Sequence, residues 1–546
     1  MILIFLSTIL LIPVLTGWGK ITEYFSGEML TGISGKIFSG IFGISILWTV
    51  FSFFIPLNLY VEVPTLIVGL LFFIKDRLYV ELFRFLRKEN LLIGFITSII
   101  LFGGSFYPYI LDHFGYYFPT IKWLREFGLV QGISNLDLTL GQMSVWHIFQ
   151  AGFSNFSDPF LRINTILLIG YTLYIIEYKS WIQLCFIPVL LLFSQSPSPD
   201  LPVIIFSLII LNEILNKNTN PSLLFTCSVF VFAIKPTMIW LPLLAFLYLV
   251  FTVKSKLTNL VPGILISLLF FTKNLWNFGY PVFPLALGDL NVGWKPNPEV
   301  LKISSQFAVQ KTYDMQYSYQ EIQRFSTVDL IKNWLFLEGI KSKINILFIL
   351  SLIIFIIFSR IRKNRIISLI CISVLIKSIL VLLFSAQYRF FVDVFFVIFF
   401  VIFTDYFNRK KSIAVFSVLS IIFIGCMTLP GILQIYLPSF RPGNFMGTFE
   451  MKQLYRPSAY HYNRYKTYKI GNLTFNVSEK YPYNFDTELP AISESYIFDD
   501  VKAGIFPQMA DPKNMKKGFI WKKLTPKEKI QAQDIINSIN RSYKQN

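Results

Sequence analysis

The chain alternates long apolar runs with short polar loops, and this alternation leaves few architectures open to it. A helix needs about 20 mainly apolar residues to cross a bilayer, and about 14 runs approach that length with a few flanking residues. Hydrophobic residues are 54% of the 546 residues and charged residues 15%, unlike soluble globular proteins. The runs lie near residues 2–17, 37–58, 60–74, 91–111, 160–177, 181–195, 201–215, 222–235, 237–253, 259–273, 344–359, 366–386, 390–406 and 412–436. We therefore expect an all-α polytopic membrane protein with about 14 transmembrane helices.

Basic residues concentrate in three short loops, KDRLYVELFRFLRKEN (75–90), RIRKNR (360–365) and NRKK (408–411). The positive-inside rule assigns such loops to the cytoplasmic side of the membrane. The formal net charge of +18 is therefore explained by membrane topology and contact with the membrane surface, and we expect no nucleic-acid partner. Counting the runs outward predicts that the segments of unusual polar chemistry share the opposite face: the loop after Asp112, the turn 194–200, the turn at Lys235, the loop 273–343, the turn 387–389 and the tail after residue 437.

The first large outer loop, residues 112–159, interrupts the apolar runs with polar and aromatic residues. Pro119 can occupy the first turn of a helix, where its missing N–H costs nothing, and Gly128 is a typical stop. Trp123 and Leu124 fall on one side of this predicted helix, with the charged residues on the other. Such an amphipathic helix suits a membrane interface.

Two further segments stand apart from the apolar runs. The loop 273–343 contains Gly and Pro turns among aromatic residues, and its length predicts a helix of its own around residues 327–338. The tail is polar and Tyr-rich and contains strand-like runs such as YKIGNLTFNV (468–477). We expect a transmembrane domain over residues 1–436, with outer loops 112–159 and 273–343, and a small extracytoplasmic α+β domain over residues 437–546.

Ionisable groups at the ends of membrane spans are costly and therefore suggest function. The residues of this kind at the predicted outer face are Asp112, Asp200, Lys235, Lys273 and Arg389. Carboxylates beside cations suit chemistry on a lipid-linked phosphate donor, because the cations offset the charge of the departing phosphate and a carboxylate accepts a proton from the acceptor hydroxyl. Each group also has a structural explanation, as a helix cap, a turn or an anchor at the headgroup level.

The acidic residue that opens the first outer loop, the aromatic helix after it, the many apolar spans and the soluble outer tail together resemble the GT-C class of polytopic glycosyltransferases. More narrowly, several segments between residues 100 and 540 are similar to a largely uncharacterised family of bacterial membrane proteins associated with surface polysaccharide synthesis. These segments are D-x-x-x-Y (Asp112, Tyr116), WLREFGLVQGISNL (123–136), SPDLP (198–202), KNLWNFGYPVFP (273–284), WKP (294–296) and QYRF (387–390).

The resemblance implies that Asp112 is a general base and that outer basic residues bind the phosphate of a polyprenyl-phosphate-linked sugar. Lys273 stands where the pattern favours Arg, so it offers a point charge in place of a bidentate fork. The candidate phosphate-binding residues are Lys273, Arg389 and Lys235, and the candidate substrate-binding residues are Tyr116, Tyr117, Asn135, Asp200, Asn274 and Trp294. No ligand spacing joins His113 and His147, so we assign no metal-binding residue and no cofactor, leaving a divalent metal open.

We therefore expect a GT-C-like transferase that moves a sugar from a polyprenyl-phosphate carrier to a glycan or lipid-linked acceptor. Its expected place is a bacterial inner membrane, with the active face and the C-terminal domain extracytoplasmic. Two alternatives use the same residues: an exporter or flippase component that guides a phosphorylated lipid without chemistry, and a polysaccharide polymerase or ligase. Pairs of broken helices in corresponding halves, typical of many transporters, are not evident in the sequence.

Overall fold

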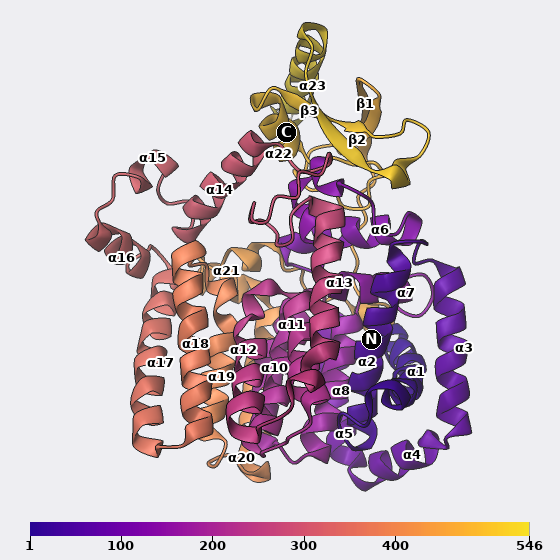
Figure 1. Cartoon of the computed structure of the whole chain (residues 1–546), viewed down its shortest axis with the longest axis vertical. Helices are drawn as coiled ribbons and strands as arrows, with labels where there is room; N and C mark the ends of the chain where they lie inside the picture. The colour runs from indigo at the N-terminus through magenta and orange to yellow at the C-terminus, as the bar shows by residue number, and fades with distance from the viewer. Residues whose placement is uncertain (545–546) are drawn as a thin grey trace.

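The computed structural model describes residues 1–544 and is mostly helical. Figure 1 shows a bundle of helices with a small mixed domain at one end, and we call residues 437–544 the C-terminal domain and that end of the bundle the domain end. The helices before the first large loop are α1 (Ile2–Ser26), α2 (Gly32–Ser52), α3 (Leu59–Lys75), α4 (Leu78–Lys88) and α5 (Asn90–Gly104). Within that loop lie a π-helical turn (His113–Tyr117), α6 (Phe118–Glu126) and α7 (Val145–Phe153).

The bundle continues on both sides of the second large loop. Before it come α8 (Ile163–Glu177), α9 (Ile187–Leu190), α10 (Asp200–Leu215), α11 (Cys227–Ile234), α12 (Trp240–Tyr248) and α13 (Val261–Phe278). The loop carries α14 (Pro298–Thr312), α15 (Tyr319–Ile322) and α16 (Thr327–Leu335), which project sideways from the domain end (Figure 1). After it come α17 (Ile340–Arg362), α18 (Arg365–Phe384), α19 (Val392–Phe403), α20 (Arg409–Thr428) and α21 (Pro430–Tyr436).

The C-terminal domain consists of two antiparallel hairpins and two helices. The first hairpin pairs β1 (Tyr465–Ile470) with β2 (Leu473–Ser478), and the second pairs β3 (Ile505–Met509) with β4 (Phe519–Lys523). The helices are α22 (Glu494–Lys502) and α23 (Pro526–Lys544). The strand-like run 468–477 therefore forms most of the first hairpin, as its sequence predicts.

In the part of the chain that the structure describes, seven helical segments are long and apolar enough to cross a membrane, which agrees with a helical membrane protein. They are Ile2–Ser26, Gly32–Ser52, Pro236–Val253, Leu257–Phe278, Ile340–Arg362, Arg365–Phe384 and Arg409–Thr428. The expected count of about 14 spans is not supported, because the other apolar runs form shorter helices or are broken by 3₁₀ and π turns.

Many of the shorter apolar helices are core helices. Every residue of α11 is buried, and so is every residue of α8 except Glu177. A helix that is apolar on all sides belongs in an interior, and an interior can be protein as well as lipid. By contrast, α17 and α20 expose large apolar side chains such as Ile357 and Ile421. Hydropathy alone cannot separate these two environments. The lower count of spans follows from length, since α8 has 15 residues and α11 only 8.

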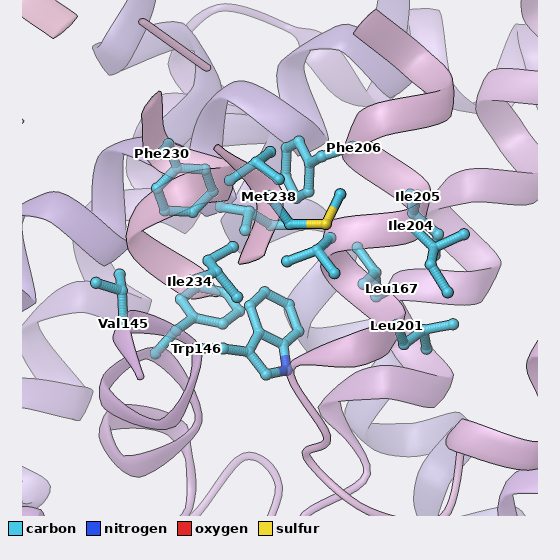
Figure 2. Packing of buried hydrophobic residues seen from close by; sticks show 14 of the residues in the cluster. Val145, Trp146, Leu167, Leu201, Ile204, Ile205, Phe206, Phe230, Ile234 and Met238 are labelled. Atoms are coloured by element: carbon cyan, nitrogen blue, oxygen red, sulfur yellow. The ribbon is translucent and has the colours of Figure 1, made fainter. Parts of the chain in front are cut away.

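Figure 2 shows the protein-filled interior of the bundle, where side chains from α7, α8, α10 and α11 meet. The rings of Phe206 and Phe230 pack edge to face with their centroids 5.5 Å apart. Trp146 is 1% exposed, and its indole N–H donates to the side-chain oxygen of Asn164 at 2.8 Å. The one polar atom of this large side chain is thus satisfied inside an apolar core.

The two ends of the bundle differ in the loops they carry. Figure 1 places α4 and the start of α20, both from basic segments, at the end opposite the C-terminal domain. The domain end carries α6, α14 and the C-terminal half of α13 (Figure 1). The arrangement agrees with the sequence argument that basic loops gather on one face and the polar loops and tail on the other.

The helix predicted after Pro119 forms as α6, and Gly128 follows it with φ +76°. A Cβ at Gly128 would lie 2.5 Å from the carbonyl oxygen of Ser52, so this position requires glycine in both conformation and space. The apolar face of α6 does not face lipid as expected: Trp123 is fully buried, with its ring 5.8 Å from that of Phe519 in β4. The C-terminal domain covers the helix. The helix predicted around residues 327–338 is confirmed as α16.

Glycines allow α1, α2 and α3 to pack with their backbones in close contact. A Cβ at Gly40 in α2 would lie 1.9 Å from the carbonyl oxygen of Leu15, and one at Gly17 would lie 1.9 Å from that of Gly69. Inside a membrane the lipid is as apolar as the side chains, so helices associate through close packing, which small residues at the contact allow. The first three helices therefore act as one tightly packed unit.

We predict that Gly40→Leu destabilises the protein by about 3 kcal/mol or more, because backbone atoms cannot yield to the new side chain. Thermal unfolding of the detergent-solubilised protein, followed by intrinsic fluorescence, measures the effect. Gly94→Leu in α5 is the matched control, since no atom lies within 4 Å of a Cβ there. Equal melting temperatures for the two variants would contradict the close packing of α1 and α2.

Candidate functional site

An ion pair between Asp112 and Arg389 lies at the centre of the candidate site. Asp112 immediately precedes the π-helical turn, Arg389 lies in the turn between α18 and α19, and the two are 277 residues apart. The guanidinium Nη1 donates to the Asp112 carboxylate at 3.0 Å. The side chains are 43% (Arg389) and 35% (Asp112) exposed, so the pair is open to a ligand.

The guanidinium of Arg389 has donor capacity to spare. Its Nε–H is buried and finds no hydrogen-bond partner among residues 1–544. Burial disfavours its charged form, but Asp112, Tyr116, Tyr117 and Asp200 together outweigh that effect and raise the pKa of Arg389. The guanidinium is thus a permanent cation with an unpartnered N–H, a combination that suits an anionic ligand such as phosphate.

A second ion pair supports the turn that presents Arg389. The ammonium group of Lys235, at the end of α11, pairs with the carboxylate of Asp200 at the start of α10. It also donates to the backbone carbonyl of Arg389 at 3.0 Å. The Ser198 hydroxyl donates to the other Asp200 oxygen at 3.1 Å. Three segments far apart in sequence are therefore joined around one ammonium group.

The π-helical turn adds Tyr116 and Tyr117 beside the charged groups. The ring centroid of Tyr117 lies 4.9 Å from that of His147 in α7, and that of Tyr116 lies 5.9 Å away. Burial first, and then neighbouring charges such as Asp112, raise the pKa of both phenols well above its ordinary value. Burial and the charge of Lys273 lower the pKa of His147 to about 3, so its imidazole is neutral at neutral pH.

Lys273, near the end of α13, is only 1% exposed and donates to the backbone carbonyl of Met143. Within the described residues, no carboxylate lies within ion-pair distance of its ammonium group. Its charge acts on His147, which contacts Tyr116 and Tyr117, so Lys273 borders the site from the inside. In this conformation it does not reach the exposed surface where Asp112 and Arg389 lie.

Three candidate substrate-binding residues serve as joints between segments. The side-chain amide of Asn135 donates to the carbonyl oxygens of Gly132, Trp294 and Phe519, which belong to the two large loops and the C-terminal domain. The indole N–H of Trp294 donates to Leu275, and the amide of Asn274 donates to Pro281. The structure does not bring these residues to the Asp112–Arg389 pair.

Sequence reasoning missed Asp137 in the first loop. It is 1% exposed and accepts hydrogen bonds from the backbone of Thr139 and from the side chains of Asn484 and Ser493 in the C-terminal domain. The only signal was local: an Asp two residues before a Thr at the start of a 3₁₀ turn. Asp137 is buried and fully engaged, whereas the side chain of Asp112 is 35% exposed, so of these two carboxylates Asp112 is the one that a substrate can reach.

A buried ion pair inside the bundle was also missed. The ammonium of Lys377 in α18 pairs with the carboxylate of Asp393 in α19, and the side chains are 1% and 6% exposed. The indole N–H of Trp240 donates to the same carboxylate at 3.2 Å. Each charge lay inside a long apolar run, so only their pairing across two helices explains how the bundle accommodates them.

In the portion of the chain described, no group of three or more His, Cys, Asp or Glu side chains is arranged to hold a metal ion. The arrangement at the domain end is instead one of paired charges, neutral phenols and one unpartnered guanidinium N–H. Such a set can bind an anionic group and accept a proton from a hydroxyl.

The fold and this cluster together indicate a helical membrane protein with a polar site between its bundle and its C-terminal domain. A model of the family described as a domain of unknown function, DUF8201, matches residues 1–396, so the chain belongs to that family. Neither the curated proteins nor the solved structures contain a match. The matched segment contains both ion pairs at the domain end and stops before the C-terminal domain.

Asp137 gives the attachment of the C-terminal domain a pH dependence. Burial raises the pKa of its carboxyl to about 6, although hydrogen bonds from Thr139, Ser493 and Asn484 oppose the shift. The ordinary value is about 3.9, so between about pH 4 and pH 6 the folded state binds more protons than the unfolded state. Stability from this group therefore falls as pH rises through that window, and the loss is complete above about pH 6.

We predict that Asp137→Asn makes the free energy of unfolding less sensitive to pH between 5 and 7.5 by roughly 1–1.5 kcal/mol. The measurement is the melting temperature of the full-length protein in detergent at both pH values, compared with the wild type. The comparison is repeated with Asp500→Asn as the background, because burial and the charges of Asp499 and Asp137 raise the pKa of Asp500, whose titration therefore depends on Asp137. Identical pH profiles for variant and wild type would refute the assignment.

Proposed function

We propose that this protein is a GT-C-like glycosyltransferase that moves a sugar from a polyprenyl-phosphate carrier to a cell-surface glycan or lipid-linked acceptor. The observation that carries the proposal is the accessible Asp112–Arg389 pair, a carboxylate and a guanidinium whose side chains are 35% and 43% exposed. A transferase of this kind needs a carboxylate beside a cation: the cation binds the donor phosphate, and the carboxylate accepts the proton of the acceptor hydroxyl.

The proposed roles follow from the geometry of each group. Arg389 binds the donor phosphate, and Lys235 and Asp200 hold the turn from which it projects. Binding of the phosphate draws the guanidinium away from Asp112 and frees that carboxylate to act as the base. In an inverting displacement the acceptor oxygen attacks the anomeric carbon, the bond to phosphate breaks, and the acceptor proton passes to Asp112. We further propose that the domain end faces the outside of a bacterial inner membrane, consistent with the basic loops at the opposite end.

We predict that Asp112→Asn lowers turnover by about 10²–10⁴-fold, because the amide cannot accept the proton. The measurement is the cell-surface glycan profile of a deletion strain complemented with the wild type or the variant, with membrane levels of each checked by immunoblot. Asp289→Asn is the matched control, since Asp289 is an exposed acid paired with Lys295 on the second large loop, apart from the cluster.

Three outcomes are informative. Loss of the glycan with Asp112→Asn at a normal protein level, and its restoration by Asp289→Asn, supports the general base. Full restoration by Asp112→Asn removes Asp112 as the catalytic residue and with it the proposed mechanism. Loss of the glycan with both variants points to a general requirement for charge on this face and likewise refutes a specific base.

A second candidate function is translocation of a phosphorylated lipid, and one observation favours it. The buried Lys377–Asp393 pair lies inside the bundle, and charges in such positions commonly mark the path of an ion or substrate through a membrane. The pair also has a structural explanation, because each charge neutralises the other and Trp240 satisfies a further carboxylate oxygen.

We predict that the double variant Lys377→Met/Asp393→Leu retains glycan synthesis, because an apolar pair can replace a buried ion pair without loss of the fold. The same complemented deletion strain provides the measurement, with accumulation of the carrier-linked glycan as a second readout. Accumulation of the carrier with this variant, together with normal glycan for Asp112→Asn, would overturn the transferase in favour of translocation.

A further inference from the structure

A group of tyrosines on the C-terminal domain adjoins the Asp112 loop, and the proposed mechanism does not use it. We call Tyr460, Tyr462, Tyr481 and Tyr483 the tyrosine platform. The rings of Tyr460 and Tyr462 are nearly parallel, with 4° between their planes and 6.1 Å between their centroids. Tyr481 stands almost perpendicular to Tyr462 at 4.9 Å. The platform therefore combines ring faces and edges from one short stretch of the chain.

The platform is fixed to the same loop that carries Asp112. Phe485, buried beneath it, lies 5.4 Å from Tyr460 and 5.1 Å from Phe114, which is two residues after Asp112. The backbone N–H of Phe485 donates to the carbonyl oxygen of Phe114 at 3.1 Å. Where the platform meets the π-helical turn after Asp112, the ring of Tyr483 lies 3.6 Å from the position that a Cβ on Gly115 would take. The tyrosines thus reach from the C-terminal domain to the edge of the candidate site.

The packed contact between the C-terminal domain and the Asp112 loop does not explain why these tyrosines are exposed to solvent. Phe114 and Phe485 are each 6% exposed and form the packed contact. Tyr481, in contrast, is 43% exposed, and the other three platform tyrosines are half-buried. Exposed aromatic rings gathered in one place are a common feature of binding surfaces, since the ring supplies contact area and the hydroxyl a hydrogen bond.

Charged groups line the platform. The Asp486 carboxylate accepts from the backbone N–H of Tyr462 at 2.7 Å and lies 3.4 Å from the imidazole of His461, whose side chain is 65% exposed. The Glu479 carboxylate lies 3.5 Å from the ammonium of Lys466. A sugar ring has C–H groups that stack on the electron-rich face of an aromatic ring and hydroxyls that hydrogen-bond to such groups. A lipid surface or an apolar peptide would not need this polar rim.

We propose that the tyrosine platform is a carbohydrate-binding site that holds the acceptor glycan against the Asp112–Arg389 pair. The identity of the bound glycan as acceptor rests on the proposed transferase function, whereas its binding to the tyrosines can be measured without any transfer. One or two sugar rings stack on Tyr460, Tyr462 and Tyr481, and Tyr483 guides the end of the glycan toward Asp112.

The experiment measures binding of oligosaccharides to the full-length protein in detergent by isothermal titration calorimetry. The probe is a set of oligosaccharides released by mild acid from the surface polysaccharide of the cells that produce the protein. The wild type is expected to bind, and Tyr460→Ala/Tyr481→Ala is expected to bind at least about tenfold more weakly, because each stacked ring contributes on that scale. Tyr481→Phe retains the ring and is expected to bind nearly as well as the wild type.

Tyr455→Ala is the matched control, since Tyr455 is a 60% exposed tyrosine of the same domain outside the platform. Melting temperatures of all variants guard against loss of folding, and the retained binding of Tyr481→Phe guards against a nonspecific effect. The inference is overturned if the wild type does not bind the oligosaccharides, or if the double Ala variant binds them as well as the wild type. It is also overturned if the variant loses affinity only for vesicles of anionic phospholipid.

The outcomes of this experiment and of the Asp112→Asn experiment are separate. Normal glycan in the Asp112→Asn strain refutes the transferase but leaves the calorimetry unchanged, since binding involves no chemistry. Loss of glycan in that strain, with unchanged affinity for Tyr460→Ala/Tyr481→Ala, retains the transferase and refutes the platform alone.

Discussion

The structure depends on one constraint: a polar group inside an apolar bundle must find a partner within the protein. Several buried polar side chains accordingly hold a loop in place. Glu62 in α3 is fully buried and accepts hydrogen bonds from the backbone N–H groups of residues 155–157. Arg162 is 1% exposed and donates to the carbonyl oxygens of Gly104 and Ser458, which joins the end of α5 to the C-terminal domain. These partners anchor the irregular segments of the domain end to the rigid helices.

The same constraint positions the charged pairs. The indole N–H of Trp146 donates to Asn164, and the amide of Asn164 donates to the carbonyl oxygens of Phe193, Ser196 and Ser198. This fixes the turn before α10, from which Ser198 holds Asp200. Asp200 pairs with Lys235, and Lys235 supports the backbone of Arg389. A continuous series of hydrogen bonds therefore runs from the packed core to the guanidinium that contacts Asp112.

Local signals in the sequence sufficed for local structure. Pro119 and Gly128 predicted the limits of α6 within two residues, and the run 468–477 predicted strand structure in the tail, which the structure shows as the first hairpin. The number of spans was wrong, because hydropathy does not show where an apolar run is broken or too short to cross a membrane as one helix, as in α8 with its 15 residues. The common face of the charged residues followed from counting runs, but the pairing of Asp112 with Arg389 depends on tertiary contacts across most of the chain. Asn135 was predicted to bind substrate, but its side-chain amide instead connects the two large loops to the C-terminal domain by hydrogen bonds.

If the protein has the proposed function, the bundle and the C-terminal domain have different roles in it. The ion pairs belong to the segment that the family model matches, whereas the tyrosine platform lies wholly beyond it. The C-terminal domain is nevertheless attached by specific bonds, since Phe519 donates to the carbonyl oxygen of Gln131, and Asp137 accepts from Asn484 and Ser493. The bundle would then supply the donor site, which requires charges near a lipid carrier, and the attached domain the acceptor site, which requires ring faces and hydroxyls. Since the two requirements are met by separate segments, the glycan preference could change through the tail while the charged machinery of the bundle stays the same.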